Sequence, residues 1–295
     1  MKRDIIGERG LCTRLRRAFL GSVAGLAMVA CFNIHAAEDD AHYLALGDSV
    51  AFGYINLAGY EYLNARNFIG YPAYVGAALQ LTTVNAACPG ETSGSFMSST
   101  ATDDGCRSYR GGAPLHVAYP GTQLAFATGF LKSHPNTRLV TIALGGNDLI
   151  LLVNGCAVAA DPTGCIETGV ASVLGGVASN MEAILAALRG SGYSGPLVVV
   201  SYYSPDYTDT LTTGAIAALN QTVAAVAGAY GALVADGFGA FELAASSAFA
   251  GGHTCMVGLL NASAQNQYLC DKHPSQSGQQ LLAQVVENAS GLQGR

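Results

Sequence analysis

Short, nearly continuous apolar runs alternate along the chain with longer segments of helical periodicity. The apolar runs predict five β-strands, at residues 43–46, 82–87, 138–144, 197–203 and 232–236. The periodic segments predict helices at residues 72–79, 123–132, 167–188, 215–229 and 275–287. Strands that are apolar throughout and alternate with helices are typical of a parallel sheet covered on both faces. The pattern therefore predicts an α/β fold with three α/β/α layers and a central, mostly parallel five-stranded sheet.

No proline-rich or charged linker interrupts this pattern, and no repeat of fixed period occurs, so we expect a single domain. Residues 88–114 are predicted to form a long loop rich in Gly, Ser and Thr. The polar and glycine-containing segments lie directly after strands. Open α/β sheets build their sites at that edge, so these segments are expected to carry the functional residues.

The first 36 residues have the layout of an export signal. Basic residues up to Arg17 precede an uncharged stretch that ends in two alanines. This layout predicts a signal peptide at 1–36 and a domain at 37–295 that is secreted or periplasmic after cleavage. The pair Arg16-Arg17 resembles a twin-arginine motif, and the general export route is the alternative. Lipid anchoring at Cys31 and a retained membrane anchor are further alternatives.

Composition and charge exclude several classes of protein. Half of the residues are hydrophobic and only 12% are charged, which excludes a disordered chain. The whole chain has a net charge of −6, but residues 37–295 hold 8 basic and 18 acidic residues, a net of −10. A nucleic acid is therefore not an expected partner. Beyond the N-terminus, no apolar run approaches the ~20 residues of a stable membrane span.

Six cysteines remain after the predicted cleavage, which suits an exported protein. These are Cys88, Cys106, Cys156, Cys165, Cys255 and Cys270. Six cysteines allow 15 disulfide pairings, of which bridges between cysteines that are neighbours in sequence are the most economical. Neither a Cys-x-x-Cys spacing nor clustered histidines accompany them, so no metal site is predicted.

Candidate catalytic groups follow three of the predicted strands. Ser49 ends the segment Gly47-Asp48-Ser49, where its hydroxyl would project from the sheet edge. Gly90 could offer its N–H to a developing oxyanion, although an ordinary turn explains it equally well. Asn147 offers a side-chain N–H for the same purpose, and a helix cap is the alternative. The two roles are compatible if Asn147 faces the site while Asp148 caps the helix.

A histidine that could serve as base lies near the C-terminus. Within residues 37–295, His273 alone has a carboxylate, Asp271, within two residues and a proline directly after it. A carboxylate can orient an imidazole, which in turn can deprotonate a serine. A surface loop before the last helix is the alternative interpretation.

Taken in order, these four segments resemble the SGNH, or GDSL-type, hydrolase family, in blocks that span nearly all of residues 37–295. The resemblance implies a flavodoxin-like SGNH hydrolase fold, with Ser49 as nucleophile and His273 as base oriented by Asp271. It further implies an oxyanion hole formed by Ser49, Gly90 and Asn147. One residue separates Asp271 from His273, whereas the commonest family pattern has two, so a main-chain carbonyl is the alternative partner of the imidazole.

The implied activity is hydrolysis of carboxylic esters through an acyl-enzyme, without cofactor or metal. Small-molecule, lipid or acylated-carbohydrate esters are the expected substrates, and a monomer is the expected form. The six cysteines resemble those of the secreted lipase and esterase branch, in which a Cys255–Cys270 bridge would brace the loop of Asp271 and His273. A carbohydrate esterase that deacetylates an extracellular polysaccharide is the first alternative, and a non-catalytic binding module is the second.

Four aromatic residues shortly after the nucleophile have two interpretations. These residues are Phe52, Tyr54, Tyr60 and Tyr62. They could line an apolar acyl pocket, or they could pack in the core or at the sheet edge.

Overall fold

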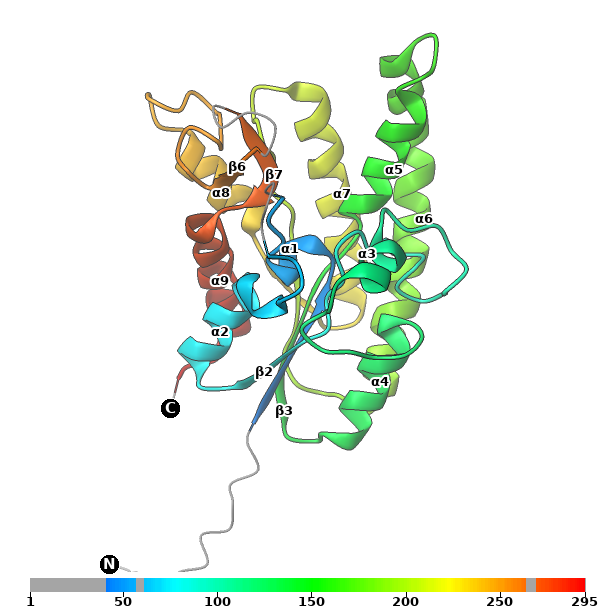
Figure 1. Ribbon diagram of the computed structural model, residues 1–295, viewed down its shortest axis with the longest axis vertical. Coiled ribbons are helices and arrows are strands. Elements are labelled where there is room, and N and C mark those ends of the chain that lie inside the picture. The colour runs from blue at the N-terminus through cyan, green and yellow to red at the C-terminus, as the bar shows by residue number, and fades with distance from the viewer. Residues whose placement is uncertain (1–40, 57–60, 264–268, 295) are drawn as a thin grey trace, which may run out of the picture. The chain divides into compact units, whose positions relative to one another are not determined.

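The computed structural model describes residues 41–56, 61–263 and 269–294, all within one compact unit, Asp39–Arg295 (Figure 1). The predicted signal peptide at 1–36, with Cys31, lies outside the described residues, and so does Tyr60. The predictions made for these residues therefore stay predictions.

A five-stranded, entirely parallel sheet forms the centre of the fold, which confirms the predicted α/β class. Its order is β2-β1-β3-β4-β5. The strands are β1 (His42–Gly47), β2 (Thr82–Asn85), β3 (Thr137–Ala143), β4 (Leu197–Val200) and β5 (Leu233–Ala235).

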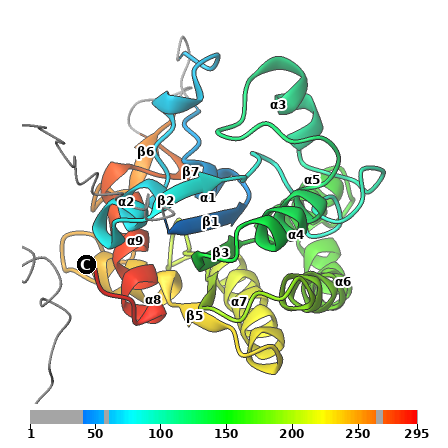
Figure 2. The ribbon, with the colours of Figure 1, turned by 90° about the horizontal axis from the view of Figure 1, so that it is seen from below.

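Side chains of β1 point alternately into two separate cores, as the two-residue period of a strand requires. Tyr43 and Ala45 belong to one core, and Leu44 and Leu46 to the other. The first core is covered by α2 (Tyr71–Leu79), α8 (Gly237–Ala245) and α9 (Gln276–Ser290). The second is covered by α4 (Gln123–Ser133), α6 (Pro162–Gly190) and α7 (Thr210–Ala229). Figures 1 and 2 show these two sets of helices on opposite faces of the sheet.

Most of the long helices begin at a side chain that accepts a hydrogen bond from their first turn. These N-cap residues are Thr122, Asp161, Asp209, Asp236 and Ser275. Two helices start five residues before their predicted positions for this reason. Asp161 caps α6 with Pro162 at its first position, and Asp209 caps α7.

The prediction of an unbroken loop at 88–114 was wrong, because α3 (Cys106–Gly112) lies within it. The disulfide Cys88–Cys106 fixes the start of this helix. Periodicity also missed three further helices and a 3₁₀ turn. They are α1 (Ser49–Phe52), α5 (Gly146–Cys156), α8 and η2 (Ala65–Asn67).

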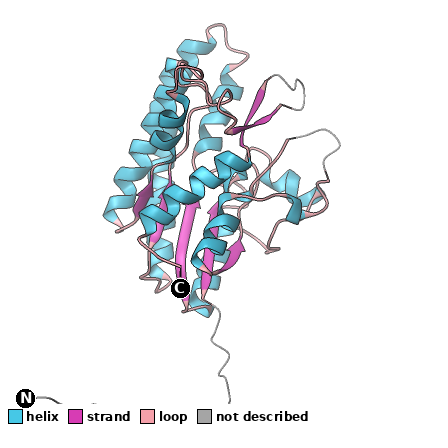
Figure 3. Cartoon of the chain, turned by 90° about the vertical axis from the view of Figure 1, so that its left-hand side faces the viewer, coloured by secondary structure: helices cyan, strands magenta, loops and turns pink. Residues whose placement is uncertain are grey.

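A small antiparallel pair, β6 (Leu260–Ala262) and β7 (Cys270–Pro274), lies apart from the larger sheet (Figure 3). The pair was not predicted, because three-residue pairing leaves little periodicity to detect. The bridge Cys255–Cys270 ties β7 to the segment before β6. The third bridge, Cys156–Cys165, joins the end of α5 to the start of α6. Each bridge therefore joins two cysteines that follow one another in the order of the six, which confirms the nearest-neighbour pairing.

Among the described helices, α6 alone is long and apolar enough to cross a membrane by length and composition. Its C-terminal half is buried in the core through residues such as Met181, Ile184 and Leu188. A core helix passes the same test, so this helix is weak evidence for a membrane span.

Candidate active site

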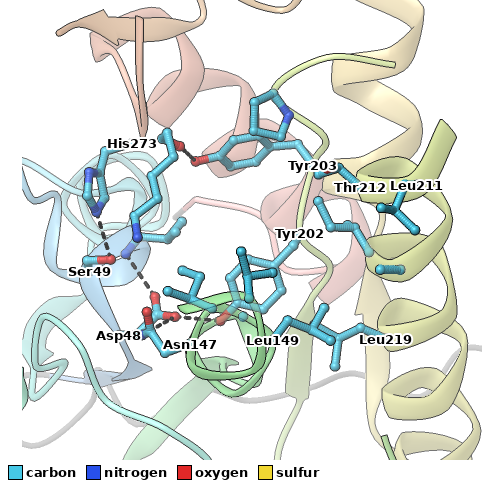
Figure 4. A pocket seen from close by; sticks show the side chains of 18 of the residues that line it. Asp48, Ser49, Asn147, Leu149, Tyr202, Tyr203, Leu211, Thr212, Leu219 and His273 are labelled. Carbon is cyan, nitrogen blue, oxygen red and sulfur yellow. Dashed lines mark hydrogen bonds between the residues drawn. The ribbon is translucent and has the colours of Figure 1, made fainter. Parts of the chain in front are cut away.

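The predicted catalytic residues gather at the carboxyl edge of the sheet, as expected for an open α/β fold (Figure 4). Ser49 directly follows β1, the segment of Gly90 follows β2, and Asn147 follows β3. His273 comes from β7 and meets Ser49 across 224 residues of sequence.

A tight strand-to-helix turn presents Ser49. Gly47 has φ +131°, and a Cβ there would lie 2.2 Å from the carbonyl oxygen of Ala143 in β3, so only glycine fits. Asp48 then caps α1 by accepting a hydrogen bond from Val50 N at 2.9 Å. Ser49 is the first residue of this helix, and its N–H has no acceptor among the described residues.

A continuous line of hydrogen-bonding groups runs from Ser49 to Asp271. His273 Nε2 lies 3.0 Å from Ser49 Oγ, and His273 Nδ1 lies 2.6 Å from Asp271 Oδ2. The structure therefore places the Asp271 carboxylate, rather than a main-chain carbonyl, against the imidazole. Nδ1–H donates to the carboxylate, which leaves Nε2 free to accept the serine proton.

Electrostatics favour the ionised form of Asp271. Burial raises the pKa of its carboxyl, but the hydrogen bond and charge of His273 and the neighbouring Lys272 lower it further, so that the pKa falls below its usual value. Lys272 N also donates to Asp271 Oδ1 at 2.7 Å, and the Lys272 carbonyl accepts from the Tyr203 hydroxyl at 2.6 Å. These contacts fix the two residues that directly precede the histidine.

Gly90 adopts a conformation that favours glycine. Its φ is +82°, and a Cβ would lie 2.3 Å from the Asp104 carbonyl oxygen. Asp104 N donates to Gly90 O at 2.8 Å, so the loop after β2 folds back on itself. The Gly90 N–H has no acceptor among the described residues.

Asn147 is buried in the first turn of α5 and faces the same site. Its Nδ2 donates to the Glu91 carbonyl at 2.9 Å and to Asp48 Oδ2 at 3.3 Å. The predicted cap at Asp148 was wrong, because Gly145 is the N-cap of α5. Asp148 instead accepts from Ser93 N at 2.9 Å and from its hydroxyl at 2.7 Å, which ties the Gly90 loop to α5.

Gln123, at the start of α4, was missed by sequence reasoning and joins two of the predicted segments. Its Oε1 accepts from Gly47 N at 2.6 Å, while its Nε2 donates to Gly47 O at 3.0 Å and to Glu91 Oε2 at 3.1 Å. Burial raises the pKa of Glu91 from 4.5 to about 7, against the hydrogen bonds from Ser95 and Gln123. No pattern in the sequence marked this glutamine.

The Gly90 loop holds the one grouping of three potential metal ligands in the described part of the chain. It consists of Cys88, Glu91 and Cys106. Both sulfurs belong to the Cys88–Cys106 disulfide, so they cannot act as thiolate ligands.

An apolar pocket of about 310 Å³ opens beside Ser49 and runs between α5 and α7 (Figure 4). Lys272 lines the pocket next to His273. The walls farther from Ser49 are Leu149, Ile150, Val153, Ile166, Pro205, Leu211, Ala215, Ile216 and Leu219, with Thr212 and the rings of Tyr202 and Tyr203.

Of the two interpretations of the aromatic residues after Ser49, packing in the core holds for those that the structure describes. Phe52 is fully buried in the first core, and Tyr54 and Tyr62 pack against that core. The ring of Tyr54 also contacts that of His273, with centroids 5.0 Å apart. The pocket walls come mainly from segments that are distant in sequence from Ser49.

Fold and site geometry thus define an α/β protein with a serine, an imidazole and a carboxylate in line beside unpaired N–H groups. Residues 45–281 match the model of the GDSL-like Lipase/Acylhydrolase family, and the chain belongs to this family. It is accordingly a carboxylic ester hydrolase, which sets aside the alternative of a non-catalytic binding module. No curated protein matches the chain significantly.

Several solved structures share the fold. Phospholipase A1 from Streptomyces albidoflavus NA297 has a TM-score of 0.58 at 20% identity, covering 85% of this chain and 99% of its own. The extracellular lipase of Streptomyces rimosus has a TM-score of 0.51 at 20% identity, covering 84% and 99%. An acetylxylan esterase from Geobacillus stearothermophilus has a TM-score of 0.52 at 16% identity, covering 87% and 97%.

The buried Glu91 predicts a specific pH dependence of stability. Because the pKa is raised on folding, the contribution of Glu91 to stability is present below its usual pKa of 4.5 and is lost as pH rises through about 7. We expect the free energy of unfolding to lose about 3 kcal/mol from this group over that interval. Urea unfolding of wild type and Glu91→Gln at several pH values measures it. In Glu91→Gln the free energy of unfolding should fall less steeply with pH between 4.5 and about 7 than in wild type. Equal slopes in the two proteins would contradict the prediction.

The contact between His273 and Asp271 yields a second prediction. Asp271→Asn should lower kcat by about 10²-fold or more, because the imidazole loses its orienting and stabilising charge. The exposed pair of Asp206 and His253, 3.1 Å apart, offers the matched control, and Asp206→Asn should leave ester hydrolysis unchanged. Steady-state kinetics on a p-nitrophenyl ester checks both variants, and wild-type rates in Asp271→Asn would show that another group orients His273.

Proposed function

We propose that the protein hydrolyses esters through an acyl-enzyme on Ser49. His273 Nε2 removes the Ser49 proton as Oγ attacks the ester carbonyl, and Asp271 stabilises the resulting imidazolium. The tetrahedral intermediate collapses, the C–O bond breaks, and the alcohol leaves with the proton from His273. Water, deprotonated by the same imidazole, then cleaves the acyl-enzyme and releases the acid.

The observation that carries this proposal is the line of hydrogen-bonding groups from Asp271 through His273 to Ser49. Distances of 2.6 and 3.0 Å join the three side chains, which come from two distant segments of the chain. The N–H groups of Ser49 and Gly90, together with the Asn147 amide, would stabilise the oxyanion. The first two have no other acceptor among the described residues, so they are available for this purpose.

The acyl group of the proposed substrate is an alkyl chain. The pocket beside Ser49 is apolar away from Lys272 and the catalytic groups, and Thr212 supplies the one aliphatic hydroxyl of the remaining wall. A sugar ring would lose its hydrogen bonds to water there without replacement, whereas an alkyl chain gains about 0.8 kcal/mol for each buried methylene. This favours lipid or alkyl esters over the acetylated polysaccharide that was the first alternative.

We also propose that the enzyme acts outside the cytoplasm. Two observations support this location, namely the export-signal layout of residues 1–36 and the three disulfides. Disulfides persist in oxidising compartments and are rare in the cytosol.

Replacement of the nucleophile tests the mechanism. Ser49→Ala should lower kcat on a short p-nitrophenyl ester by roughly 10⁴-fold or more, because no other group can carry the acyl chain. A fluorophosphonate should label the wild type and not the variant, while the two unfold at similar urea concentrations. Retained hydrolysis or labelling in a folded Ser49→Ala protein would exclude Ser49 as nucleophile.

A change in the pocket wall tests the substrate class. Wild type should prefer p-nitrophenyl octanoate to acetate, and to acetylated xylan. Ala215→Phe fills the pocket and should lower the octanoate-to-acetate ratio of kcat/KM by roughly tenfold or more. Ala225→Phe, at an exposed position of the same helix, is the matched control and should leave the ratio unchanged. An unchanged ratio in Ala215→Phe would mean that the acyl chain binds elsewhere.

A further inference from the structure

Both amide protons of Asn147 are engaged in the resting site. Nδ2 donates one to the Glu91 carbonyl at 2.9 Å and the other to Asp48 Oδ2 at 3.3 Å. An oxyanion can therefore accept a hydrogen bond from Asn147 only if one of these two bonds breaks. The bond to Asp48 is the longer of the two, so it is the easier one to exchange.

Asp48 can release Asn147 because other donors satisfy its carboxylate. Oδ1 accepts from Val50 N at 2.9 Å, and Oδ2 accepts from the Tyr202 hydroxyl at 2.6 Å. A bond this short to an ionised acceptor is among the strong hydrogen bonds of proteins. Without it, buried Oδ2 would depend on Asn147 alone, since an unsatisfied buried charge is costly.

Tyr202 is held in place from two sides. Asn220 of α7 bonds both backbone groups of Tyr202, accepting from its N at 2.9 Å and donating to its O at 2.7 Å. On the other side the ring lies against Gly146 at the start of α5, where a Cβ would come within 2.9 Å of the ring. The hydroxyl is therefore directed at Asp48 while the ring forms a wall of the pocket (Figure 4).

We propose that the Tyr202 hydroxyl is a positioning group for ester hydrolysis, because by satisfying Asp48 it frees one N–H of Asn147 for the oxyanion. The proposal rests on the acyl-enzyme mechanism above. Tyr202 touches no reacting atom in this role and acts only through Asp48. The same residue thereby links the acyl pocket to the oxyanion hole.

The proposed role of Tyr202 also depends on pH, because its partner Asp48 titrates. Burial raises the pKa of its carboxyl to about 6, and the hydrogen bond from Tyr202 is the largest influence that lowers it. Loss of that bond moves the pKa of Asp48 upward, so the ionised carboxylate persists only at higher pH. The other titratable groups that act on Asp48 or its partner Tyr202 are Tyr71, Tyr203, Asp148, Lys272 and His273.

Tyr202→Phe removes only the hydroxyl and keeps the apolar wall. We expect kcat on p-nitrophenyl octanoate to fall about tenfold, short of the ~10²–10³ for loss of an oxyanion donor itself. KM should stay unchanged, because the oxyanion exists only in the transition state. The acid limb of the kcat profile should also move to higher pH. Tyr193→Phe is the matched control, because its buried hydroxyl donates to Pro196 O far from the pocket.

A double-mutant cycle separates this role from simple packing. Asp48→Asn keeps a side chain that caps α1 but removes the charge, so kcat should fall. In that background Tyr202→Phe should have almost no further effect, because its only route to the site is gone. Additive losses, a raised KM with unchanged kcat, or an unshifted pH profile in folded Tyr202→Phe would each overturn the proposal. None of them would alter the result expected for Ser49→Ala, so the two proposals fail separately.

Discussion

The close approach of β1 to β3 at Gly47 is the constraint on which the site depends. The Ala143 carbonyl occupies the space that a Cβ of residue 47 would need. Gln123 bonds both backbone groups of Gly47. Gln123 also bonds Glu91 beside Gly90, so one side chain fixes both the turn that carries Ser49 and the segment of Gly90. Any side chain at residue 47 would separate the strands and displace Ser49 from His273.

Buried carboxylates hold the site together at a cost in stability. Asp48 and Glu91 are almost fully buried, and burial raises the pKa of both. Within the described part of the chain neither has a cation at hydrogen-bond distance. Each accepts a local hydrogen bond, from Val50 N or the Ser95 hydroxyl, and a bond from another segment, from Tyr202 or Gln123. The site is therefore built from polar bonds between segments, whereas the surrounding cores are apolar. Such a network is rigid when complete and sensitive to the loss of one donor.

The sequence predicted what local patterns encode and missed what distant helices build. The parallel sheet followed from the apolar strands, and Ser49 and Asn147 at its edge from polar residues placed after them, whereas His273 was assigned from the neighbouring Asp271 and the family resemblance. The pocket walls, Gln123 and Tyr202 did not, because they lie on helices and loops whose relation to Ser49 is set by packing. Tyr202 is 154 residues from its partner Asp48. The short helices α1 and α5 were also missed, since a few turns carry too little periodicity.

A crystal structure of the enzyme inhibited by an octylphosphonate tests the central claim most directly. The account predicts phosphorus bonded to Ser49 Oγ and the phosphoryl oxygen within hydrogen-bond distance of Ser49 N, Gly90 N and Asn147 Nδ2. The octyl chain should lie between α5 and α7. Phosphorus on another residue, or a phosphoryl oxygen directed at solvent instead of these three donors, would contradict the account.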